Sequence, residues 1–136
     1  MARRRHQSRV AVMQALFERD SRPSVDPHAS LLMNEQELGE SDGDFAAKLM
    51  LGILEHEGTI KQSIQDHAPG WTLDRMDPIS RCILLMGAYE LLFANDAPPA
   101  VVMNEAIDIA KEYGSDEAGK FVNGVLNAIA QGKKIS

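Results

Sequence analysis

DPISRCILLMGAYELLF, residues 77–93, is the segment that says most about the fold of the chain. Its first two residues, Asp77 and Pro78, are typical of a helix start, because aspartate can cap unpaired backbone N–H groups and proline fits the first helical position. Behind them, apolar side chains occupy almost every side of a helix, as expected of an element that is covered on several sides. The stretch therefore predicts a central helix for the second half of the chain.

Apolar residues recur at helical spacing in almost every other segment. Proline, glycine and capping residues mark the breaks between helices, and the clearest internal boundary is Pro69-Gly70. One long helix is expected between about residues 44 and 68, with Ile53, Ile60 and Ile64 on its inward side. The remaining helices are expected at about residues 4 or 8–19, 26–38, 98–113 and 115–131, with one short turn within residues 71–76.

Together these elements predict an all-α fold of six to seven helices in two small antiparallel bundles. The N-terminal helical subdomain, residues 1–69, is expected to carry an arginine-rich arm, and the C-terminal helical subdomain to cover residues 70–136. At 136 residues, with 44% hydrophobic side chains, the chain is long enough to bury a core of its own.

The charge of the chain is unevenly distributed. The formal net charge is −6, yet the first nine residues hold no acid and four arginines, namely Arg3, Arg4, Arg5 and Arg9. Guanidinium groups bind phosphates through paired hydrogen bonds and stack on bases, so this cluster fits an RNA-binding arm. A solvated terminus would have the same composition, and both interpretations stay open. The rest of the chain is an acidic body that could dock a basic protein.

The last predicted helix carries a polar stripe beside its apolar face. Lys120 and Asn123 lie on neighbouring turns, with Asn127 one turn beyond. Within that helix, Gly124 costs up to about 1 kcal/mol relative to alanine, which favours either an external contact or tight helix packing. Phe17, in the first helix, fits the core more plainly, although an aromatic ring at an exposed rim can also stack on a base.

No part of the sequence resembles an active site or a metal centre. The four histidines are scattered, and the single cysteine, Cys82, has no partner for a disulfide or a thiolate zinc site. Glycine-rich phosphate loops, nucleophile elbows and CxxC motifs do not occur. We therefore expect no catalytic residue, no metal site, no cofactor and no enzymatic activity. Because the sequence contains neither a signal peptide nor an apolar run of about 18 residues, we expect no membrane span and a reducing, cytoplasmic setting.

Four blocks of the sequence, in this order, are SRVAVMQALF (8–17), GAYEL (87–91), NEAIDIAK (104–111) and KFVNGVL (120–126). Together they resemble the NusB family of bacterial transcription antitermination factors, and the resemblance covers nearly the whole chain. It implies an all-helical fold with two subdomains. It also implies binding of the single-stranded boxA element of ribosomal RNA leader transcripts, together with the ribosomal protein NusE, in an antitermination complex on RNA polymerase.

The resemblance further implies which residues bind. In the family, the arginine-rich start and the last helix contact RNA, which implies RNA-binding roles for Arg3, Arg4, Arg5, Arg9, Phe17, Lys120, Phe121 and Asn123. NusE binds the second subdomain in the family, which implies a partner surface at Leu73, Arg75, Asp77, Ser80 and Arg81. Many relatives have an acid at the position of Ser80 and an arginine at that of Leu85, so this interface is expected to use different ion pairs here.

The sequence is therefore compatible with either of two functions, which belong to different classes. The first is an adaptor that captures boxA RNA together with NusE. The alternative is an RNA-independent protein-interaction adaptor that docks a basic partner on its acidic body. The sequence leaves open whether the free protein is a monomer or a homodimer that hides its RNA-binding face, and whether the arginine arm is ordered without RNA.

Overall fold

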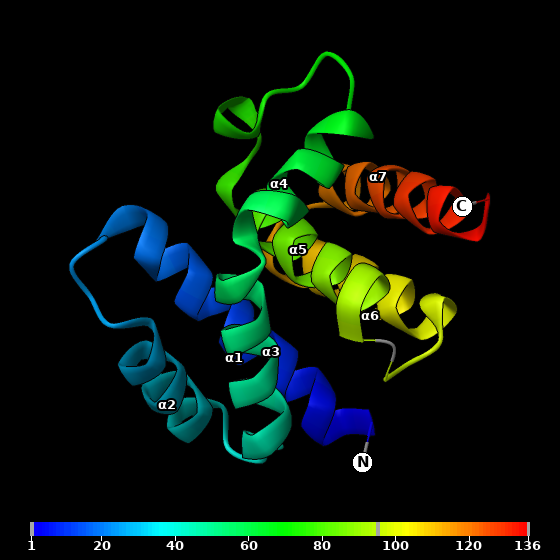
Figure 1. Cartoon of the computed structure of the whole chain (residues 1–136). Coiled ribbons are helices and arrows are strands. Elements are labelled where there is room, and N and C mark those ends of the chain that lie inside the picture. Colours follow the sequence, from blue (N-terminus) through cyan, green and yellow to red (C-terminus); the bar gives the residue numbers. More distant parts are fainter. Residues whose placement is uncertain (1, 95, 136) are drawn as a thin grey trace. The chain divides into compact units, whose positions relative to one another are not determined.

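The computed structural model describes residues 2–94 and 96–135, and every regular element within them is helical. The prediction of an all-α fold is thus confirmed for the described part of the chain. Figure 1 shows the elements, which in chain order are α1 (Ala2–Ser21), α2 (Pro27–Leu38), α3 (Gly43–Glu55), α4 (Glu57–Asp66), the 3-10 turn η1 (Leu73–Arg75), α5 (Pro78–Tyr89), the π-helical stretch η2 (Glu90–Ala94), α6 (Pro99–Tyr113) and α7 (Asp116–Ile135).

The helices form two compact units. The first unit ends at Glu55 and contains α1, α2 and α3, and the second unit begins at His56 and contains the remaining elements. The division predicted at Pro69-Gly70 would place α4 in the first unit, whereas α4 packs on α5 and α7. The observed division therefore lies one helix earlier in the chain.

The expectation of a single long helix between residues 44 and 68 is wrong, because the chain is interrupted at His56. This residue lies between α3 and α4 with φ −113° and ψ 18°. Its ring stacks on that of Phe93 in η2, with 4.2 Å between the ring centroids, and this contact within the second unit supports the turn. The inward stripe resumes in α4 at Ile60, which is fully buried, so the spacing of the apolar residues does not reveal the interruption.

In the first unit, α2 and α3 both pack on α1. The middle of α1 is covered almost all round, since residues 10–13, 15 and 16 are at most 1% exposed. Asp26 caps α2 as predicted, accepting the backbone N–H of His28 at 3.4 Å. Gly39 ends α2 with φ 92°, a conformation that glycine adopts at little cost.

In the second unit, α5 is the central helix, as its apolar sequence predicts. It packs on α4, α6, α7 and η2 (Figure 1), and residues 83–86 are at most 1% exposed. Asp77 caps α5 through its carboxylate, which accepts a backbone N–H at 3.2 Å. Helix α7 approaches closely at Gly87, where a Cβ atom would lie 2.8 Å from Cδ1 of Leu126. Cys82 lies in the same core with none of its surface exposed.

The end of this central helix differs from the expectation. Regular α-helix continues only to Tyr89, and the chain then widens into η2. Phe93, expected on a helix covered all round, is 36% exposed at the end of this π-helical stretch.

Candidate nucleic-acid surfaces

The predicted arginine arm forms the first turns of α1. Arg3, Arg4 and Arg5 are exposed, and the first turn of this helix contains no acidic residue. Arg4 Nη2 donates a hydrogen bond to the Ser41 carbonyl oxygen at 3.2 Å, and Arg5 Nε lies 3.8 Å from Asp42 Oδ2. Exposed ion pairs of this kind contribute about 1 kcal/mol or less. A phosphate can therefore compete for these arginines at little cost.

Arg9 differs from the other three arginines because it is only 3% exposed. Its guanidinium carbon lies 4.9 Å from the centre of the Phe45 ring, and that of Arg5 lies 4.7 Å from the same ring. Such cation–π contacts contribute about 0.5–2 kcal/mol, depending on burial. Phe45, which was not among the predicted site residues, thus ties the arm to α3. The burial of Arg9 fits a residue that positions the arm.

Ser8 fastens the same end of α1 to the start of α3. Its Oγ accepts the backbone N–H of Asp42 at 2.8 Å, and the hydroxyl lies within donating distance of the carbonyl oxygens of Asp42 and Arg4, at 2.9 and 3.0 Å. The carboxylate of Asp42 in turn accepts the backbone N–H of Phe45 at 3.1 Å, as a helix cap does. The first two turns of α1 are therefore supported by the rest of the first unit.

Phe17 lies near the other end of α1. It is 38% exposed, so it is not the core residue that its helical spacing favoured. Its position is twelve residues beyond Arg5, which corresponds to roughly 18 Å along a helix with a rise of 1.5 Å per residue. A single-stranded ligand would have to run along α1 to meet both residues.

In the second unit, the residues predicted to bind RNA lie together on α7. Lys120 and Asn123 are exposed, Phe121 is half-buried, and the fully buried residue of this turn is Val122. Gly124 is exposed, and a Cβ atom built there would meet no described atom within 4 Å outside its own helix backbone and chain neighbours. Tight helix packing is therefore not the reason for a glycine at this position.

Trp71, which the sequence predicts only as part of a short turn, is a neighbour of this surface. Its side chain is 51% exposed, and its ring meets that of Phe121 edge to face, with 5.6 Å between the centroids. The side-chain amide of Gln65 holds the loop at two points. It donates to the carbonyl oxygen of Trp71, and it accepts the backbone N–H of Leu73 at 3.1 Å. The signal available in the sequence was a lone tryptophan directly after Pro69-Gly70.

The residues predicted to contact a protein partner divide into two groups. Arg75 and Asp77 are exposed and Leu73 is half-buried, so all three offer some surface. Ser80 is 2% exposed and bonded to the Asp77 carboxylate, while Nη1 of Arg81 donates to the carbonyl oxygen of Leu73 at 3.0 Å. The last two residues therefore bond to the segment around η1, Ser80 from a buried and Arg81 from a half-buried position.

Within residues 2–94 and 96–135, no group of three or more His, Cys, Asp or Glu side chains is arranged to hold a metal ion. Over the same residues, no helix is long and apolar enough to cross a membrane.

Comparison with known proteins gives one consistent family. A family model described as the NusB family matches residues 6–131. The chain is 41% identical to the transcription antitermination protein NusB of Nitratiruptor sp., over 93% of this chain and 91% of that protein. It is 42% identical to the protein of the same name from Bacillus subtilis, over 93% of this chain and 94% of that protein. These relatives are transcription factors, in agreement with the prediction that the chain is not an enzyme.

Solved structures give the same result. The fold is similar to that of T. maritima NusB, with a TM-score of 0.81 and 36% identity over 93% of this chain and 89% of that one. It is also similar to a chain in the crystal structure of the antitermination factors NusB and NusE in complex with double-stranded RNA. That likeness has a TM-score of 0.85 and 30% identity, over 97% of this chain and 99% of that one.

Proposed function

The chain belongs to the NusB family, and on that premise we propose that it binds boxA-type single-stranded RNA together with NusE and promotes ribosomal RNA transcription in an antitermination complex. The observation that carries the proposal is the exposed group Arg3, Arg4 and Arg5 at the N-terminal end of α1. Each cation at this positive end of the helix dipole lowers the stability of the helix by about 0.3 kcal/mol or more. A bound polyanion offsets that cost.

The two surfaces would have different roles in RNA binding. The arm would neutralise phosphates, with Arg9 holding it in place over Phe45. On α7, Lys120 would meet a further phosphate, while Phe121 and Asn123 would contact bases by stacking and hydrogen bonding, the usual mode for single-stranded RNA. The exposed ring of Phe17 would serve a base farther along α1.

We propose that NusE docks on the second unit around η1. Leu73, Arg75 and Asp77 would contact the partner, while Ser80 and Arg81 would keep the loop in shape from within. A similar solved structure that contains both NusB and NusE with RNA supports the assignment of both partners.

Binding of a labelled boxA-type RNA, measured by fluorescence anisotropy across a salt series with and without NusE, tests this function. Neutralisation of three or four phosphates predicts a log–log salt slope of roughly −2 to −3. We expect the boxA-type RNA to bind more tightly than a scrambled RNA, and NusE to increase the difference.

The double variant Arg3→Ala and Arg4→Ala should flatten this slope by roughly 1 to 1.5, since each phosphate contact contributes about 0.7 for a single strand. The matched control is the double variant Arg22→Ala and Lys48→Ala, which removes the same charge from exposed positions elsewhere in the first unit. Equal, weak binding of both RNAs, unaffected by NusE, would instead favour the protein-docking alternative.

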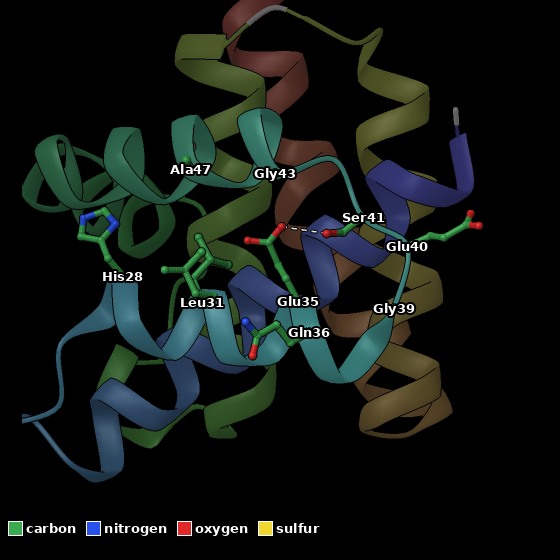
Figure 2. Close-up of a pocket in the computed structure, with 10 residues that line it drawn as sticks. His28, Leu31, Glu35, Gln36, Gly39, Glu40, Ser41, Gly43 and Ala47 are labelled. Atoms are coloured by element: carbon green, nitrogen blue, oxygen red, sulfur yellow. Dashed lines mark hydrogen bonds between the residues drawn. The ribbon is translucent and has the colours of Figure 1, made fainter.

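That alternative is favoured by one feature of the first unit, a groove of about 670 Å³ between α2 and α3. Figure 2 shows Glu35 between the two helices, where its carboxylate accepts a hydrogen bond from Ser41 at 2.7 Å. Glu40 also lines the groove, and the neighbouring Leu32 is 64% exposed. The double variant Glu35→Lys and Glu40→Lys should not weaken RNA or NusE binding under our proposal, whereas binding of a basic partner docked in the groove would be lost.

A further inference from the structure

The second unit contains an open patch formed by Trp71, Phe121 and Gly124, here called the aromatic shelf. The ring of Trp71 is 51% exposed and stands edge to face against Phe121. Gly124 follows Phe121 three residues later, and residues at this spacing share a side of a helix. The shelf therefore combines an exposed indole with a stretch of α7 backbone that no side chain covers.

The backbone that carries the indole is held in place before any ligand arrives. Gln65 bonds the loop at the carbonyl oxygen of Trp71 and at the backbone N–H of Leu73, and the backbone N–H of Trp71 donates to the Ala68 carbonyl oxygen at 3.1 Å. Gly70 makes the preceding turn with φ 88°, which a residue with a side chain rarely adopts. A loop fixed in this way loses little conformational freedom when a ligand stacks on its ring.

Gly124 gives a second, independent indication of a ligand. A glycine inside a helix costs about 1 kcal/mol relative to alanine. At Gly87 the packing of Leu126 explains the glycine, but at Gly124 an added Cβ would meet nothing within 4 Å. Gly58 is equally open, but it is the second residue of α4, and a glycine in the first turn costs less than one inside a helix. The bare backbone at Gly124 is therefore open to close approach by another molecule.

We propose that the aromatic shelf is a stacking site for an unpaired RNA base, in addition to the contacts of Lys120, Phe121 and Asn123. The base stacks on the indole of Trp71, and Gly124 lets the ribose and phosphate pass close to α7 beside the cation of Lys120. This inference rests on the proposed RNA-binding function. Because every base has a π face, the shelf adds affinity with little preference for sequence.

The single tryptophan of the chain makes the shelf directly observable. Anisotropy of a labelled boxA-type RNA reports binding, while the emission of Trp71 reports contact at the shelf. We expect the tryptophan emission of the full-length protein to be quenched by RNA, with the same midpoint as the anisotropy change and without NusE. Quenching by NusE but not by RNA would overturn the inference, since the shelf would then be a protein contact.

Variants of the shelf give a second readout. Trp71→Ala should weaken RNA binding about 5- to 100-fold, and Trp71→Phe less, because a smaller ring remains to stack on a base. Gly124→Ala should weaken RNA binding roughly threefold or more while raising resistance to urea, because alanine favours the helix. Gly58→Ala is the matched control, another open helical glycine, and should leave RNA binding unchanged.

The outcomes separate this inference from the function on which it rests. If the RNA binds with the expected salt slope but Trp71→Ala and Gly124→Ala bind as the unmodified protein does, the shelf is not part of the RNA path and the function stands. If the unmodified protein binds neither the boxA-type nor the scrambled RNA, both are overturned. Weaker binding by Gly124→Ala in a protein more stable to urea supports the shelf, because loss of folding cannot explain it.

Discussion

At the scale of a single residue, Gly87 shows how a missing side chain lets two helices meet. Gly87→Ala would place a methyl group 2.8 Å from Cδ1 of the fully buried Leu126, so the side chain or the helix must shift. We expect the free energy of unfolding to fall by about 1–3 kcal/mol, despite the better helix propensity of alanine. Urea denaturation measures this change. Added to Leu126→Ala, the same substitution should cost less than it does alone, and strictly additive effects would contradict the close contact.

At the scale of elements, the hydrogen bonds of Ser8 decide whether the arm is a helix or a frayed terminus. Ser8→Ala removes the acceptor of the Asp42 N–H and the hydroxyl that can donate to the carbonyl oxygens of Asp42 and Arg4. We expect a loss of about 1–3 kcal/mol, the cost of an unsatisfied buried group, with faster amide hydrogen exchange in the first two turns of α1. Ser21→Ala is the control, because the bond from its hydroxyl to the Phe17 carbonyl oxygen is exposed. Equal exchange in both variants would show that α1 holds its own N-terminus.

The capping contacts show which helix starts can be predicted from the sequence alone. The starts of α2 and α5 could be predicted because Asp26 and Asp77 cap them through N–H groups only two or three residues away. The start of α1 could not, since its support comes from residues 34 positions along the chain. Likewise, the RNA-binding candidates could be predicted one by one, but the pairing of Trp71 with Phe121 depends on the fold. Only the structure brings that loop to α7.

At the scale of the whole molecule, the distribution of charge predicts which residues set the association rate of RNA and which set its dissociation rate. Four of the fourteen basic side chains lie in the first nine residues, and the chain as a whole has twenty acids. Exposed charges steer association, whereas desolvated contacts govern dissociation. We therefore expect the double variant Arg3→Ala and Arg4→Ala to slow association and to weaken its salt dependence, and Gly124→Ala to speed dissociation. Stopped-flow measurements with labelled RNA separate the two rates, and a faster dissociation in the arginine variant alone would contradict this division.

The burial of Cys82 makes its thiol a probe for opening of the second unit. A thiol with no exposed surface, in the helix around which the second unit packs, is shielded from a modifying reagent until that unit opens. When closing is faster than modification, the labelling rate reports the free energy of opening. Because the chain has one cysteine, the labelling rate reports only the exposure of Cys82 in α5. Ligands that stabilise the second unit should therefore slow the labelling of Cys82, whichever surface of the unit they bind.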